Sequence, residues 1–184
     1  MKKSLLFLVF VSFSILCNAQ TDAEIKPFIV KGYEVLHKEN GDLNKDGKSD
    51  CLLILKVKDE DKKTENEVPR PLLILIRQPD GKLKQVARND KVVLCYQCGG
   101  VFGDPFSDIT IKNGYFSIEH YGGSSWRWTR IITFKYNPTD KKWYLHKDGS
   151  DSFHTSEPDK VETKVKTTKD FGKVLFENYD VNKE

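Results

Sequence analysis

WRWTRIITFKY, at residues 126–136, is the stretch that decides the fold class of this chain. Its even positions carry Trp126, Trp128, Arg130, Ile132, Phe134 and Tyr136, and its odd positions carry Arg127, Thr129, Ile131, Thr133 and Lys135. Successive side chains of a β-strand point to opposite faces, so we expect the large even set to face the interior and the odd set to face water. The stretch therefore predicts a half-buried strand.

Short apolar runs separated by Gly, Asn, Asp and Pro repeat along most of the chain, as is typical of antiparallel sheet proteins. The run LLILI at 72–76 is apolar at every position, which predicts a central strand buried on both faces. The expected strands are 33–38, 51–58, 71–77, 82–87, 91–95, 108–112, 115–121, 126–136, 142–147 and 173–178. The predicted fold class is all-β, mainly antiparallel sheet in a sandwich or open barrel, with a short N-terminal helix within 22–31.

Two turns and two polar segments complete this prediction. Asn113-Gly114 is a strong hairpin signal, and NPTDKK at 137–142 predicts a second reversal. The charged, apolar-poor segment 59–70 predicts a mobile loop between two strands, and the polar segment 148–170 predicts no definite element.

The first nineteen residues have the layout of a secretory signal peptide: basic Lys2 and Lys3, an apolar run, and small residues ending at Ala19. A lipoprotein signal ending before Cys17 is the less favoured alternative, because Leu16 stands where a small residue is wanted. We therefore expect a signal peptide at 1–19, a single mostly β domain at 20–184, and a secreted or periplasmic location.

The charge of the chain is almost balanced. Lys and Arg number 30 against 27 Asp and Glu, and without Lys2 and Lys3 the balance is 28 against 27. Such a composition gives no global reason to expect a nucleic acid partner. No later segment is long and apolar enough to predict a transmembrane segment. A monomer is expected, with an unknown small ligand, glycan or protein as partner.

Three cysteines follow the expected signal peptide. In an oxidising compartment two of them should pair, and Cys95 and Cys98 are close enough for a small disulfide loop. Free buried thiols, or a catalytic or zinc-binding role, are the alternatives for this pair. The glycine-rich turn after Cys98 lacks the helix that a redox motif needs. Cys51 lies in the apolar run CLLILKV and is expected in the core.

The segment GDLNKDGKSD at 41–50 carries the sharpest chemical signal. Oxygen-bearing side chains alternate at Asp42, Asn44 and Asp46, and Asp50 follows. Gly47 permits a sharp turn, and the carbonyl of Lys48 can add a ligand, so the loop can offer a hard cation several oxygens. The alternative is a plain Asx-rich turn without an ion.

These residues match the pattern D-x-N-x-D-G-x-x-D, and the flanking segments look like strands. The segment resembles the calcium loops of FG-GAP (integrin-like, VCBS-type) repeats and, over the loop only, the dockerin calcium segment. The resemblance implies a local module with structural Ca²⁺, whereas Leu53 stands where an EF-hand has its bidentate Glu. Affinity near about 10⁻⁴–10⁻³ M is expected, because Lys45 and Lys48 offset part of the negative charge.

A glycine- and aromatic-rich region spans 98–106 and 120–128. Tyr121, Trp126, Arg127 and Trp128 could bind a sugar ring or an extended peptide, or they could simply belong to a packed core. His120, Glu119 and Asp104 are weak catalytic candidates, and His120 is better explained as a hydrogen-bonded core histidine.

One complete ligand pattern and no complete catalytic constellation favour a non-enzymatic function. The prediction is an exported binding or surface-associated module with one structural calcium-type loop. The alternatives are a hydrolase acting on glycans or peptides near the glycine-aromatic region, and a structural envelope protein without an ion.

Overall fold

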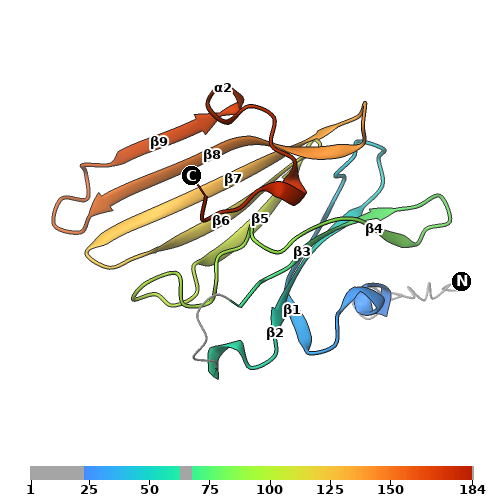
Figure 1. Cartoon of the computed structure of the whole chain (residues 1–184), viewed down its shortest axis with the longest axis horizontal. Helices are drawn as coiled ribbons and strands as arrows, with labels where there is room; N and C mark the ends of the chain where they lie inside the picture. Colours follow the sequence, from blue (N-terminus) through green and yellow to red (C-terminus); the bar gives the residue numbers. More distant parts are fainter. Residues whose placement is uncertain (1–22, 63–67, 184) are drawn as a thin grey trace, which may run out of the picture.

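The computed structural model describes residues 23–62 and 68–183, and these residues form two antiparallel sheets (Figure 1). The first sheet has the order β1-β2-β3-β4 and the second has the order β5-β6-β7-β8-β9. The strands are β1 (Tyr33–Gly41), β2 (Asp50–Val57), β3 (Leu72–Arg77), β4 (Leu83–Asn89), β5 (Phe106–Lys112), β6 (Tyr115–Gly123), β7 (Trp126–Asn137), β8 (Lys142–His154) and β9 (Glu162–Thr167). The predicted all-β fold class is confirmed.

The main core lies between the two sheets. It joins Leu52 and Ile74 of the first sheet to Phe116 and Phe134 of the second. Apolar side chains that leave water in this way contribute about 25 cal/mol per Å² of buried area.

The predicted N-terminal helix is confirmed as a short helical segment over residues 23–28, which ends in η1 (Lys26–Phe28). Ile25 and Phe28 pack on the outer face of the first sheet, against Leu53 and Leu73. Because the core covers the inner face and this segment the outer face, β2 and β3 are buried on both sides. The double-sided burial predicted for residues 72–76 is therefore confirmed.

The predicted turns are also confirmed. Asn113 and Gly114 both have positive φ, 54° and 74°, as a tight hairpin of this type requires, and they connect β5 to β6. Residues 137–142 form the reversal between β7 and β8, where Asn137 pairs with Lys142.

Two strand assignments are wrong, and one segment without a predicted element has regular structure. Residues 91–95 form a loop, and residues 173–178 contain the short helix η3 (Phe176–Asn178), with only Leu175 bridged to Tyr144. Within 148–170, β8 continues to His154, β9 pairs with it, and helix α2 (Thr168–Phe171) follows. The apolar pattern of 173–178 is explained by burial of the η3 side chain Phe176 rather than by a strand.

Phe176 anchors the C-terminal segment in the main core. Its ring meets those of Phe116 and Phe134 edge-on, with centroids 5.7 and 5.2 Å away. The side-chain amide of Asn89 in β4 donates to the carbonyls of Phe176 and Tyr179. The chain end is thereby fixed to both sheets.

The expected signal peptide at 1–19 lies outside the described residues. Within the described part of the chain, every helix is too short and too polar to cross a membrane.

Candidate metal centre and neighbouring sites

The calcium-type loop connects β1 to β2, and Gly41 pairs with Asp50 where the strands meet. Backbone amides of the loop donate to its own carboxylates. The amide of Gly47 donates to Asp42 Oδ2 at 2.9 Å, and the amide of Lys48 donates to Asp46 Oδ1 at 2.9 Å. Lys45 and Gly47 adopt positive φ, 65° and 80°, which lets the chain wrap around the acidic side chains.

Asp50 is the buried member of the loop. Its side chain is inaccessible to solvent, and its carboxylate accepts the amides of Leu43 and Arg77, both at 2.9 Å. Burial is the largest cause of a raised pKa of Asp50, and the charges of Asp46 and Asp42 raise that pKa further. The folded loop therefore concentrates negative charge around a carboxylate that has little water to stabilise it.

Asp42, Asp46 and Asp50 converge. One carboxylate oxygen of each lies within 4.8 Å of the corresponding atoms of the other two. Asn44 lies beside them, since its Oδ1 accepts the amide of Asp46 at 3.0 Å and its Nδ2 donates to Asp46 Oδ2 at 3.2 Å. This donor set of carboxylate and amide oxygens fits a hard cation such as Ca²⁺.

The loop is attached to the second sheet as well. Leu43 is fully buried in the main core, and its carbonyl accepts the indole N–H of Trp143 at 3.2 Å. Gly41 lies against Ile111 of β5. The candidate metal centre therefore stands at the junction of the two sheets.

Comparison with known proteins gives no family for this arrangement. Neither protein-family models, nor curated proteins, nor solved structures yielded a match.

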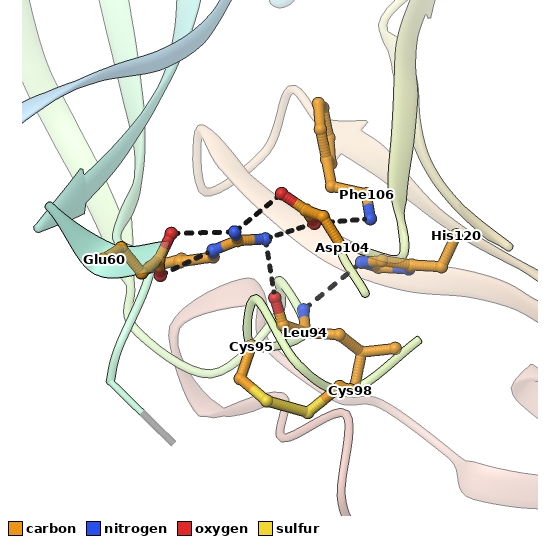
Figure 2. Close-up of a disulfide and its surroundings, with 8 residues drawn as sticks. Glu60, Leu94, Cys95, Cys98, Asp104, Phe106 and His120 are labelled. Atoms are coloured by element: carbon orange, nitrogen blue, oxygen red, sulfur yellow. Dashed lines mark hydrogen bonds and ion pairs between the residues drawn. A yellow bond between two sulfur atoms is a disulfide. The ribbon is translucent and has the colours of Figure 1, made fainter. Parts of the chain in front are cut away.

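Cys95 and Cys98 form the expected disulfide (Figure 2). Cys51 is a buried free thiol in β2, as expected for a core residue. Burial is the main cause that raises the pKa of its thiol to about 12, so the thiol stays protonated and unreactive.

A buried arginine next to the disulfide was not foreseen from the sequence. Arg70 is fully buried, and its guanidinium donates to Glu60 at 2.8–2.9 Å, to Asp104 at 2.7 Å and to the carbonyl of Leu94 at 3.2 Å (Figure 2). Glu60 belongs to η2 (Glu60–Lys62) and is also buried. The segment 59–70 connects β2 to β3 as predicted, but Glu60 and Arg70 at its two ends are buried and held together, which a mobile loop would not require.

The three catalytic candidates do not share one open site. His120 is 2% exposed, and its Nε2 accepts the amide of Leu94 at 3.3 Å (Figure 2). Asp104 is engaged by Arg70. Glu119 precedes His120 on β6 and so points to the opposite face of the sheet.

Burial, followed by the nearby charges of Arg130 and Arg70, lowers the pKa of His120 to about 4. His120 is therefore neutral at physiological pH. This placement fits a hydrogen-bonded core histidine.

The two glycine-rich stretches lie against each other. The amide of Gly123 donates to the carbonyl of Gly99 at 3.0 Å, and the amide of Val101 donates back to the carbonyl of Gly123 at 3.2 Å. A Cβ on Gly122 would lie 2.5 Å from the Trp128 ring, so a glycine is needed for this close approach.

The four ligand-binding candidates are divided between locations. Arg127 and Tyr121 both contact the Phe102 ring, with Arg127 Cζ 4.2 Å from its centroid. Trp126 is 54% exposed beside His154, so the expectation that it faces the interior is wrong at this end of β7.

Trp128 lines a separate groove, which we call the β9 groove. This groove has a volume of about 610 Å³ and lies between β7, β8, β9 and the C-terminal segment, with Leu94 and Cys98 of the disulfide loop also lining it. Of the four ligand-binding candidates only Trp128 lines the groove, and its β9 side was missed because β9 has no apolar alternation and residues 148–170 carried no predicted element.

Proposed function

We propose that this protein is an exported, non-enzymatic binding module in which a calcium-type ion pins the β1–β2 loop. The observation that carries the proposal is the convergence of the Asp42, Asp46 and Asp50 carboxylates within 4.8 Å. Carboxylates spread apart into solvent would have removed its basis.

The electrostatics of the loop favour a bound cation. Three carboxylates close together repel one another, and burial of Asp50 weakens the screening by water. Within the part of the chain that the structure describes, neither Lys45 nor Lys48 forms an ion pair with these carboxylates. A divalent ion would supply the missing countercharge.

The proposed role of the ion is structural. Leu43 lies inside the loop and is fixed in the main core, and Trp143 binds its carbonyl. An ion that holds the loop therefore stabilises the junction between the sheets. An affinity of about 10⁻⁴–10⁻³ M would suit an extracellular or periplasmic compartment, in keeping with the signal peptide expected at residues 1–19.

The hydrolase alternative receives no support from the geometry. A hydrolase of this kind requires Glu119, His120 and Asp104 around one open pocket. In the structure, Glu119 points to the opposite face of β6 from His120, His120 is buried, and Asp104 is paired with Arg70. Non-enzymatic binding remains the better explanation.

Calcium titration with thermal melting tests the proposal. Ca²⁺ in the millimolar range should raise the Tm of the wild-type protein, because a ligand that binds only the folded state stabilises it. Asp46→Ala should abolish this increase. Asp80→Ala is the matched control, since Asp80 is an exposed turn aspartate whose carboxylate likewise accepts an amide, that of Lys82.

Terbium luminescence gives a local readout. Trp143 donates to the loop carbonyl of Leu43, so its indole is placed to sensitise Tb³⁺ held by the loop. Sensitised emission should appear in wild type and Asp80→Ala, and disappear in Asp46→Ala. Absence of both the emission and the Tm shift in wild type would contradict the proposal.

A further inference from the structure

The β9 groove combines an apolar floor with an excess of positive charge. Among its lining residues, Trp128, Leu145, Phe171 and Val174 are apolar. Its charged lining consists of four cationic side chains, Arg130, Lys164, Lys166 and Lys183, against two acidic ones, Asp148 and Asp180. Its volume of about 610 Å³ is within the range of small-molecule sites, roughly 300–1,000 Å³.

Strand register places the two β9 lysines over this floor. Arg130 pairs with Ser150, and Ser150 pairs with Lys164, so these three side chains share one face of the sheet. The neighbouring row joins Asp148 to Lys166 in the same way. The C-terminal segment crosses this face (Figure 1), and Arg130 donates to the carbonyl of Val181 at 2.8 Å.

The acidic side chains of the groove are already neutralised. Arg130 donates to both oxygens of Asp148, at 3.0 and 2.8 Å, and the hydroxyl of Tyr179 donates to Asp148 at 2.7 Å. Asp180 lies 3.4 Å from Lys91 and 3.9 Å from Lys183. The groove's own carboxylates therefore do not attract a cationic ligand.

Lys164 and Lys166 are left as the available charges. Both are exposed, and neither forms an ion pair with any residue that the structure describes. Lysines on an edge strand also discourage edge-to-edge pairing of sheets. That role accounts for the lysines of β9 but not for the apolar groove beside them.

We propose that the β9 groove binds a small amphipathic organic anion. Its carboxylate or similar headgroup would lie at Lys164 and Lys166, and its apolar body would lie on Trp128, Phe171 and Val174. This inference rests on the proposed function as a binding module and specifies its ligand class. It does not require the ion, because the groove is lined by the second sheet, the C-terminal segment and two residues next to the disulfide, Leu94 and Cys98, and by none of the acidic loop residues 42–50.

Octanoate and anilinonaphthalene sulfonate are suitable probes, because each combines an anionic group with an apolar body. With the chain in Ca²⁺-containing buffer, the sulfonate should become fluorescent and octanoate should displace it. Neutral octanol, which has a chain of the same length, should compete far more weakly. Equal competition by octanol, or no binding of either anion, would overturn the proposal.

The Lys164→Gln/Lys166→Gln double variant should bind octanoate on the order of tenfold more weakly, since charge-assisted contacts are lost. Lys147→Gln is the matched control. It removes the same kind of charge from an exposed position on the opposite face of β8, where Lys147 pairs with Thr133. Melting curves should confirm that all variants remain folded. Wild-type affinity in the double variant would refute the lysine headgroup site.

Two further outcomes separate this proposal from its alternatives. If β9 pairs with a second copy instead, size-exclusion chromatography should show a dimer that octanoate does not dissociate, and the proposal fails. Octanoate binding that persists in Asp46→Ala and is lost in the lysine double variant supports the groove whatever the result of the calcium experiment. Loss of octanoate binding in folded Asp46→Ala would contradict the stated independence of the groove from the ion.

Discussion

Arg70 and Asp104 form a two-pronged ion pair across 34 residues of sequence, with Nη1–Oδ1 and Nη2–Oδ2 both at 2.7 Å. The adjacent Nε–Nη2 edge of the same guanidinium binds both carboxylate oxygens of Glu60. One buried arginine thus links the segment before β3 to the loop that carries the disulfide. Such networks matter most when one member is removed, because the remaining buried charges lose their partner.

Arg70→Met should therefore destabilise the protein by about 3–5 kcal/mol, because it leaves Glu60 buried without its cation. Urea unfolding measures this change. Arg88→Met is the matched control, since Arg88 makes a comparable ion pair with Asp90 at a site where both side chains are about 40% exposed. That variant should lose at most about 1 kcal/mol. Similar losses in the two variants would contradict the structural role of the buried network.

Gly122→Ala should destabilise the protein by about 1–3 kcal/mol through overpacking. The new Cβ would lie 2.5 Å from Trp128 Cζ2 and 2.9 Å from Gly99 Cα, so the floor of the β9 groove would have to shift. Gly149→Ala on β8 is the control, because the nearest atom to its Cβ would be 3.8 Å away. Thermal melting of the two variants should show a loss at Gly122 alone.

Acid should destabilise the protein through His120. The pKa of His120 is lowered to about 4 in the folded state, mainly by burial and then by Arg130 and Arg70, while Asp104 and Asp148 act in the opposite direction. The unfolded state, with the ordinary pKa of 6.5, binds the proton first. Stability is therefore present above pH 6.5 and is lost as pH falls toward 4, by on the order of 3 kcal/mol.

Urea unfolding at a series of pH values measures this dependence. In His120→Gln the histidine contribution is removed, and a glutamine oxygen can still accept the Leu94 amide. The slope of unfolding free energy against pH should flatten in this variant. His154→Gln should keep the steep slope, because His120 remains. An unchanged slope in His120→Gln would show that another group dominates.

Titration of thiols should show one disulfide and one buried free cysteine. For a chain beginning at Gln20, no thiol should react in the native state, one should react after unfolding without reductant, and three after reduction. Replacing Cys95 and Cys98 by Ser should cost about 2 kcal/mol, because the bridge closes a short loop. A native-state reaction at Cys51 would contradict its burial.

The strand pattern could be derived from the sequence wherever burial imposes a period. The LLILI run and the alternating Ile132 and Phe134 were assigned correctly, because each lies where two layers meet. Trp126 was assigned wrongly for the complementary reason. Alternation selects a face of the sheet, but the first sheet does not cover that face as far as Trp126.

The candidate sites differ in how far they could be predicted. The acidic loop is mostly local, since Asp42 to Asp50 span one hairpin, and Arg77 of β3 adds one distant contact by donating its amide to Asp50. The arginine network and the β9 groove are not local. Glu60, Arg70, Lys164 and Lys166 come from charged or polar segments without apolar periodicity, so the sequence does not show which distant residues they meet.

In this protein, the features determined by local sequence can be distinguished from those determined by tertiary contacts. Composition and spacing along the chain were sufficient for the β class, the tight turns, the Cys95–Cys98 bridge and the acidic hairpin, because each depends on residues close in sequence. Contacts between distant segments were required to bury Arg70 and His120, and the pairing of β7, β8 and β9 was required to align Lys164 with Arg130. These arrangements depend on which distant segments contact each other, and the local propensities of the sequence do not determine those contacts.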